Sequence, residues 1–375
     1  MRIGVPREIK VMEHRVGLTP GSVRELCAYG HGVIVEAGAG EGIGMDDEAY
    51  RRAGASIVGK AAEVFEKAEM IVKVKEPQAA ERKLLKRGQI LFTYLHLAPD
   101  AEQVRDLVAS GVICIAYETV TSASGGLPLL APMSEVAGRM AIQAGAYFLE
   151  KPLGGRGLLL GAVPGVAPGQ VVVIGGGMVG YNAAVIALGL GANVTIIERS
   201  IDRMRHLEEV LGGRVTLLMS SSLQIEESVV QADVVIGAVL IPGAVAPKLV
   251  TRAMVAGMKE GSVIADVAID QGGCFETARP TTHSEPVYVV DGVTHYCVAN
   301  MPGAVPITAT KALTNATLPY VEAIATHGLP EAVARDPALV RGVNVLDGKI
   351  TYQAVAEAHD LDYAPLEDVL PLSPV

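Results

Sequence analysis

Four residues carry side chains that could act on a carbonyl or an amine: Arg15, Lys75, His96 and Asp270. His96 lies in TYLHLAP, where an apolar run ends shortly before Pro99. Loops that follow the strands of a parallel sheet gather at one edge, so we expect His96 in a cleft. Its imidazole suits proton exchange with a carbonyl during hydride transfer at neutral pH. The alternative is a strand-end histidine whose ring is satisfied by the backbone.

Lys75 and Arg15 supply two cations, in the segments MIVKVKEP and MEHRVGLTP. A guanidinium matches a carboxylate and an ammonium can also polarise a carbonyl, so the pair predicts a keto-acid site. Asp270 ends SVIADVAID and precedes two glycines at 272–273, which indicate a backbone packed close to a ligand. Its carboxylate is therefore expected to face a nicotinamide. The alternatives are solvated surface charges for the two cations and an ordinary turn aspartate for Asp270.

A glycine turn predicts a dinucleotide site. Residues 175–180 read GGGMVG, so Gly175, Gly177 and Gly180 form a GxGxxG between a Val/Ile run and an apolar helical segment. Such glycines allow a tight turn and a close approach of backbone N–H groups to a pyrophosphate. Glu198 ends the next apolar run, where a carboxylate binds ribose hydroxyls and repels the 2′-phosphate of NADP. We therefore expect NAD, and the alternative is a Rossmann-like turn that binds no phosphate.

Two series of short apolar runs, separated by segments with helical spacing, must position these residues. This alternation predicts an α/β fold in which each series forms a parallel sheet covered on both sides by helices. The first series comprises residues 3–6, 33–38, 70–77, 90–97 and 112–118, with helical segments at 22–29, 46–53 and 101–109. The second comprises residues 171–175, 193–198, 215–218, 233–239, 262–267 and 294–299.

Two further helical segments, 134–151 and 306–327, flank the second series and are natural bridges between domains. If the second sheet is an insertion, the chain from about Pro306 returns to the first domain. We therefore predict a substrate domain made of residues 1–130 and 306–375, and an NAD-binding Rossmann domain made of residues 131–305. The alternative is three consecutive units.

Composition and charge limit the partners. Of 375 residues, 50% are hydrophobic and 19% are charged, which predicts a compact globular protein. The net charge of -10, without a long basic run, argues against nucleic acid or an anionic membrane as the main partner. The four cysteines form no CxxC pair and the first residues lack the apolar core of a secretory signal, so we expect a cytoplasmic protein with reduced thiols.

Seven blocks together resemble the alanine dehydrogenase family, which is related to the N-terminal part of transhydrogenase. They are MRIGVPREIK, HRVGLTP, VKVKEP, LHLA, IGGGMVG, DVAIDQGG and VANMPGAVP, and they span nearly the whole chain in the family's order. The resemblance implies two Rossmann-like domains, with the NAD domain inserted into a discontinuous substrate domain. It also implies reversible, NAD-dependent deamination of L-alanine to pyruvate and ammonium by a homo-oligomer, usually a hexamer.

The resemblance implies roles for particular residues. Arg15 and Lys75 would hold the carboxylate and carbonyl of pyruvate, His96 would be the acid/base, and Asp270 would assist amination and deamination. Residues implied to contact NAD, besides the glycines, are Ser134, Met178, Val179, Glu198, Arg203, Ser220, Val239, Leu240, Val267, Ala268, Ile269, Asp270, Val298, Ala299, Asn300 and Met301. Glu198 stands where the family commonly has aspartate and Arg203 where it has lysine, which makes the preference for NAD over NADP less secure.

Other functions stay open at this point. The NAD(H)-binding component of a proton-translocating transhydrogenase resembles the same head and glycine turn, but it needs no keto-acid site. A non-catalytic NAD sensor would bind the cofactor without turnover. A lysine or saccharopine dehydrogenase relative would need a larger substrate pocket. We expect no metal, although Glu118 and His327 could be ligands if the fold brings them together.

Overall fold

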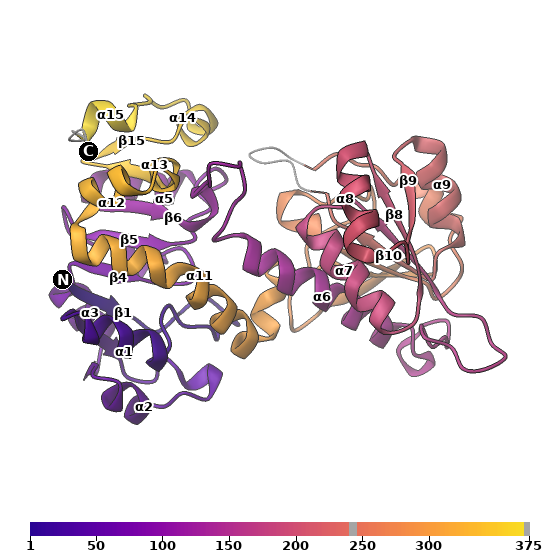
Figure 1. The fold of residues 1–375 in the computed structure, drawn as a ribbon, viewed down its shortest axis with the longest axis horizontal. Helices are drawn as coiled ribbons and strands as arrows, with labels where there is room; N and C mark the ends of the chain where they lie inside the picture. The colour runs from indigo at the N-terminus through magenta and orange to yellow at the C-terminus, as the bar shows by residue number, and fades with distance from the viewer. Residues whose placement is uncertain (240–245, 371–375) are drawn as a thin grey trace. The chain divides into compact units, whose positions relative to one another are not determined.

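The chain folds into two compact units, which a computed structural model describes for residues 1–239 and 246–370 (Figure 1). Unit 1 consists of Met1–Met133 and Val305–Val375, and unit 2 of Ser134–Ala304. The chain thus leaves unit 1 after residue 133 and returns to it at residue 305, close to the divisions expected at 130 and 306. In Figure 1 the orange and yellow C-terminal helices lie against the indigo and purple N-terminal strands of unit 1.

Unit 1 is built on a sheet of eight strands within the described residues. Six are parallel, in the order β3-β2-β1-β4-β5-β6, and β14 and β15 extend this sheet beyond β6 in the antiparallel sense. The strands are β1 (Arg2–Val5), β2 (Gly32–Glu36), β3 (Ser56–Val58), β4 (Met70–Val72), β5 (Ile90–Thr93), β6 (Ile113–Ala116), β14 (Val343–Leu346) and β15 (Lys349–Ile350).

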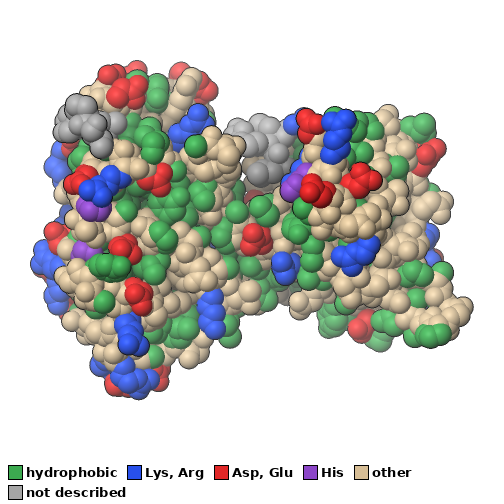
Figure 2. All heavy atoms as spheres, viewed as in Figure 1, with side chains coloured by type: hydrophobic (Ala, Val, Ile, Leu, Met, Phe, Trp, Pro, Cys, Tyr) green, Lys and Arg blue, Asp and Glu red, His purple; other side chains and the backbone are tan. Residues whose placement is uncertain are grey.

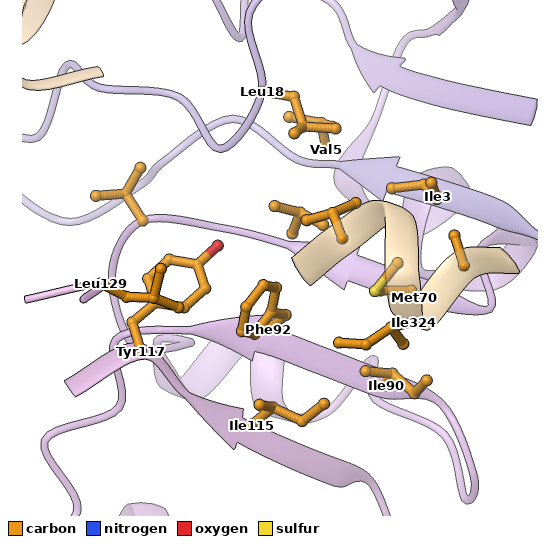
Figure 3. Close-up of a cluster of buried hydrophobic side chains, with 14 of the residues drawn as sticks. Ile3, Val5, Leu18, Met70, Ile90, Phe92, Ile115, Tyr117, Leu129 and Ile324 are labelled. Atoms are coloured by element: carbon orange, nitrogen blue, oxygen red, sulfur yellow. The ribbon is translucent and has the colours of Figure 1, made fainter. Parts of the chain in front are cut away.

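Helices cover both faces of this sheet, and nearly every strand residue is buried as a result. One face packs against α1, α11, α12 and α13, and the other against α3, α5 and α14. Figure 3 shows the first of these cores, where Ile3, Met70 and Phe92 from three strands meet Ile324 of α11. The helices of the unit are α1 (Pro20–Ala28), α2 (Asp47–Arg52), α3 (Ala61–Lys67), α4 (Ala79–Arg82), α5 (Ala101–Ser110), α11 (Pro306–His327), α12 (Leu329–Arg335), α13 (Ala338–Gly342), α14 (Gln353–His359) and α15 (Leu366–Val369), with 3₁₀ turns η1 (Glu41–Ile43) and η2 (Tyr117–Thr119).

Unit 2 repeats the same order of parallel strands, β9-β8-β7-β10-β11-β13, followed by an antiparallel β12. These strands are β7 (Gln170–Ile174), β8 (Asn193–Glu198), β9 (Thr216–Met219), β10 (Val234–Gly237), β11 (Val263–Asp266), β12 (Val287–Val290) and β13 (Val293–Tyr296). The helices that cover them are α6 (Ala131–Phe148), α7 (Met178–Gly189), α8 (Ile201–Leu211), α9 (Ser222–Gln231) and α10 (Arg252–Ala256), with 3₁₀ turns η3 (Lys151–Leu153), η4 (Val267–Gln271) and η5 (Met301–Ala304).

The predicted α/β fold with two Rossmann-like sheets is confirmed, but the sheets are parallel only in their main part. Strand β14 pairs with β6 in the antiparallel sense without forming a hairpin. The other two antiparallel pairs, β12 with β13 and β14 with β15, are hairpins closed by Asp-Gly turns at 291–292 and at 347–348, in which both residues have positive φ (49° and 78°, 51° and 75°). Such turns match the twist of the two strands they join, and Asp-Gly is a strong signal for them. The sequence prediction missed strands β12, β14 and β15, although the Asp-Gly motif that closes both hairpins can be read from the sequence.

Local sequence explains where α1 begins. The Thr19 side chain accepts a hydrogen bond from Ser22 N, and Pro20 occupies the first position of α1. Residues 157–197 carry no charged side chain, and the structure divides them into a loop, β7, α7 and the greater part of β8. Across the described residues, no helix is long and apolar enough to cross a membrane.

On the face shown in Figure 2, Lys and Arg side chains are interspersed with Asp and Glu.

Candidate active site

Three of the four predicted reactive residues follow neighbouring strands of unit 1. Arg15 lies in the loop after β1, Lys75 in the loop after β4, and His96 after β5. Strand β4 pairs with β1 on one side and with β5 on the other, all in parallel, so the three loops leave the same edge of the sheet. The strand order reverses between β1 and β4, and ligands of open α/β sheets bind beside such a switch point.

Arg15 is buried, with 2% of its surface exposed, and is held by Glu13. Its Nε and Nη2 each donate a hydrogen bond of 2.6 Å to the two carboxylate oxygens of Glu13, and Nη1 lies 3.1 Å from the sulfur of Met133. Burial opposes the charge, but the hydrogen bonds and charge of Glu13 outweigh it and raise the pKa of Arg15. The two residues also line a cavity of about 610 Å³ in unit 1.

A buried ion triad lies under the loop that carries Lys75. The Nζ of Lys73 is 3.1 Å from Glu8 and 2.7 Å from Glu81, and none of the three side chains is more than 3% exposed. The same Glu8 carboxylate accepts the N–H groups of Val74 at 2.7 Å and Lys75 at 3.4 Å. The triad therefore fixes the backbone from which the half-buried Lys75 side chain projects. Sequence reasoning missed it, although IVKVKEP contains both lysines.

His96 is exposed and its backbone is in the left-handed region, with φ of 48°. For a residue other than glycine this conformation costs about 1–2 kcal/mol. Glu118 compensates, because its carboxylate accepts the N–H groups of Leu95 at 3.1 Å and His96 at 2.6 Å. The ring of Tyr94 lies parallel to the imidazole, with centroids 5.9 Å apart. The turn thus presents the imidazole to solvent from a fixed backbone.

The glycine turn of unit 2 is tight and closely packed on one side. Gly175 has φ of 100°, and a Cβ on Gly180 would lie 1.9 Å from the carbonyl oxygen of Gly175. A Cβ on the exposed Gly177, by contrast, would meet nothing within 4 Å. Helix α7 begins there without a side-chain cap. The turn is closed on its packed side and open on the side from which a phosphate would approach backbone N–H groups.

Glu198 connects the end of β8 with this turn. Its carboxylate accepts the N–H of Gly176 at 2.7 Å and those of Arg199 and Ser200 at 2.7 and 2.9 Å. Arg203 adds a bond of 2.6 Å from Nε to the carbonyl oxygen of Gly176. Both residues therefore shape the glycine turn, and the Glu198 side chain is half-buried beside it.

The other residues expected to contact NAD follow strands of unit 2 at the same carboxyl edge. Ser220 follows β9, Val239 follows β10, residues 267–270 follow β11 and residues 298–301 follow β13, while Ser134 lies in α6. Ala268, Ile269, Val298 and Met301 are buried, whereas Met178, Asp270 and Ala299 are exposed. Leu240 lies outside the described residues.

The four predicted reactive residues thus divide between the units, with Asp270 on η4 of unit 2 and the other three in unit 1. Within the part of the chain that the structure describes, no three His, Cys, Asp or Glu side chains form a group able to hold a metal ion. Glu118 is engaged with the backbone before His96, and the ring of His327 lies 3.6 Å from Glu331.

Comparison with known proteins decides the family. Residues 4–137 match the family described as "Alanine dehydrogenase/PNT, N-terminal domain", and residues 141–353 match its C-terminal domain. The chain belongs to the alanine dehydrogenase/PNT family. Among family members, the alanine dehydrogenase of Halomonas elongata is 59% identical, over 97% of this chain and 98% of that protein. The alanine dehydrogenase of Methanococcus maripaludis is 56% identical, over 99% of this chain and 100% of that protein.

Solved structures agree with this family assignment. A structure of L-alanine dehydrogenase matches with a TM-score of 0.93 and 53% identity, covering 96% of this chain and 99% of that one. A transhydrogenase from Sinorhizobium meliloti matches with a TM-score of 0.82 and 25% identity, covering 93% and 100%. Both branches of the family therefore share the fold, and the alanine dehydrogenases are much more similar in sequence.

Proposed function

We propose that this chain is an L-alanine dehydrogenase, an oxidoreductase that deaminates L-alanine to pyruvate and ammonium with NAD as its cofactor. One observation carries the proposal. Arg15, Lys75 and His96 lie on neighbouring loops at the switch point of unit 1, in a chain that alanine dehydrogenases match over nearly its whole length. Two cations and an imidazole at one sheet edge fit a small keto acid.

The residues of unit 2 fit a dinucleotide. Beside Gly177 there is open space at the N-terminus of α7, where backbone N–H groups would donate hydrogen bonds to a pyrophosphate. Glu198 stands at the end of the adjacent strand β8, where a carboxylate receives ribose hydroxyls and disfavours a 2′-phosphate. When bound, NAD supplies the hydride acceptor, and NADH returns the hydride in the reverse direction.

The side chains divide the remaining work. Arg15 and Lys75 would hold the carboxylate and the carbonyl group of the substrate. His96 would accept and return protons as water adds to the imine and ammonium leaves, and Asp270 would assist these transfers. Glu13, Glu8 and Glu118 would act only by holding Arg15, the Lys75 loop and His96 in place.

A transhydrogenase-like function is the second candidate, because a transhydrogenase shares the fold at 25% identity. It would bind NAD(H) and pass hydride to a second nucleotide without using alanine. The cations of unit 1 would then have no substrate. This difference makes the two functions separable by a single substrate test.

The test is NADH formation from L-alanine at alkaline pH, measured with NAD and with NADP. His96→Ala and Asp270→Asn should each lower kcat by about 10²- to 10⁴-fold, the usual contribution of a general acid or base. The exposed α8 residues supply matched controls, His206→Ala and Asp202→Asn, which should keep wild-type activity. Tight NADH binding without turnover of alanine or pyruvate would refute the proposal and favour the transhydrogenase-like function.

We also propose, from the family resemblance, a homohexamer located in the cytoplasm. Light scattering on the purified protein would measure its mass directly. A stable monomer that is fully active would contradict this part of the proposal.

A further inference from the structure

The segment that carries Asp270 is held by a buried carboxylate outside the proposed catalytic set. We propose that Asp266, assisted by Lys248, is a positioning residue that fixes loop 267–274 and thereby the location of Asp270. This inference rests on the proposed function, in which Asp270 takes part in proton transfer. It concerns a residue that would touch neither substrate nor cofactor.

The contacts of Asp266 close the loop on itself. Asp266 is the last residue of β11 and is fully buried. One carboxylate oxygen accepts the N–H of Ala268 at 3.1 Å, and the other accepts the N–H of Cys274 at 2.9 Å. The two ends of the loop are therefore tied to one side chain, and the exposed Asp270 lies between them.

Two glycines make room for this carboxylate. A Cβ on Gly273 would lie 2.5 Å from one oxygen of Asp266, and a Cβ on Gly237 would lie 2.7 Å from the other. Gly273 also has φ of 76°, which favours glycine. The backbone of two separate segments is thus shaped around the carboxylate, as expected for a site built to hold it.

Lys248 holds the other side of the same loop. Its Nζ donates to the carbonyl oxygens of Gly272 at 2.5 Å and Gly273 at 3.0 Å. Backbone bonds from Ala246 to Gln271 and from Leu249 to Cys274, both 2.9 Å, continue this attachment. The loop is consequently fixed from β11 and from segment 246–250.

Asp266 is suited to this role only when ionised. A carboxylate accepts at both oxygens, whereas a protonated carboxyl would direct an O–H towards one of the two N–H donors. Burial raises the pKa of Asp266 to about 6, against the lowering effect of the Cys274 and Ala268 N–H groups and of Lys248. The other titratable groups facing it are the Cys274 and Cys297 thiols, whose pKa values are raised by burial, so they stay neutral at pH 7.

Asp233 provides the matched control. It is another buried aspartate of unit 2, it accepts the N–H of Gln170 at 2.8 Å, and it pairs with Arg156 and Lys259. It precedes β10, at the edge of the sheet opposite to Asp270. Loss of its charge should therefore affect folding without moving the loop.

The experiment compares Asp266→Asn, Lys248→Met and Asp233→Asn with the wild type. We measure kcat and KM for alanine from pH 5 to 9, NADH affinity by fluorescence, thermal unfolding, and hydrogen exchange of the amides at 268 and 274. Asp266→Asn should lower kcat on the order of 10- to 100-fold, the cost of a small misplacement of a reacting group. It should also speed exchange of both amides and make the fall in kcat/KM below about pH 6 less steep, because the contribution from protonation of Asp266 is then absent.

Lys248→Met should produce a smaller loss in kcat and the same faster exchange, while Asp233→Asn should leave kcat and the loop unchanged. Wild-type kcat and exchange in Asp266→Asn would overturn the inference, as would an equal loss of kcat in Asp233→Asn at equal stability. If Asp266→Asn does not fold, unchanged loop exchange in Lys248→Met would overturn it. If the wild type itself does not oxidise alanine, the proposed function fails, and loop exchange and NADH affinity still decide whether Asp266 positions the loop.

Discussion

Replacing Lys73 by methionine should destabilise unit 1 strongly. The change leaves Glu8 and Glu81 facing each other, both at most 3% exposed, without the ammonium that lay 3.1 and 2.7 Å away. Removing one partner of a buried ion pair costs about 3–5 kcal/mol, because an uncompensated charge stays in the interior. Glu8 keeps its hydrogen bond from Val74 N and Glu81 keeps one from Gln78 N, which places the expected loss at the lower end, about 3 kcal/mol.

The loss should depend on pH in a defined direction. Burial already raises the pKa of Glu8 above its ordinary 4.5 in the wild type, although Lys73 lowers it, so removal of Lys73 should raise this pKa further. The folded variant then binds the proton more tightly than the unfolded chain. The free energy of unfolding of the variant should therefore be lowest at high pH. It should increase as the pH falls through the raised pKa of folded Glu8 towards 4.5, the ordinary pKa of the group.

The assay is urea unfolding of Lys73→Met and the wild type at pH 8, 7 and 6. A triple variant, Glu8→Gln with Lys73→Met and Glu81→Gln, removes all three charges and should regain most of the lost stability. The exposed pair of Lys67 with Glu63, 3.5 Å apart, supplies the control, since Lys67→Met should cost at most about 0.5 kcal/mol. A loss below about 1 kcal/mol for Lys73→Met, or one that grows towards acid pH, would refute this reasoning.

Two further predictions concern activity and binding. Glu118→Ala removes the acceptor of the Leu95 and His96 N–H groups and should lower kcat about 10- to 100-fold. Glu118→Gln keeps an acceptor oxygen and should recover part of the activity. An unchanged kcat in Glu118→Ala would show that the left-handed turn needs no anchor. Gly180→Ala would place a Cβ 1.9 Å from a backbone oxygen and should weaken NADH binding at least tenfold by fluorescence titration. Gly189→Ala in the same helix, with nothing within 4 Å of the added Cβ, is its control and should bind normally.

Much of the fold is encoded in local patterns. The Val/Ile run before Gly175 became β7, and the helical spacing of residues 306–327 became α11 with the same bounds. The pairing of β14 with β6 joins Val343 to Ile115, and no local pattern reveals a partner so far away in sequence. The turn at 347–348 predicts a hairpin, but it does not say which sheet the hairpin extends.

In the candidate site too, local patterns could be read from the sequence, whereas contacts between residues distant in sequence could not. Lys75 and His96 lie at the ends of apolar runs, which places them at the carboxyl edge of a parallel sheet. Arg15 could be selected only as a loop cation that would complete the same constellation. Their supporting groups could not, since Lys73 meets Glu8 across 65 residues of sequence. The positive φ of His96 is equally hard to see in TYLHLAP: histidine is enriched in the left-handed region, but residues other than glycine adopt it so seldom that the residue type alone does not mark the position.

The return of the chain to unit 1 at Val305 sets an order for biosynthesis. The six parallel strands of that unit are translated first, but α11, α12 and α13, which cover one face, come from residues after 305. At ribosomal rates the intervening unit takes on the order of ten to thirty seconds to synthesise. Throughout that interval the nascent chain carries the apolar face of Ile3, Met70 and Phe92 without those helices, and all of unit 2 is synthesised before they are. The first strands made are thus among the last to be enclosed, and this interval is when a chaperone would act on the chain.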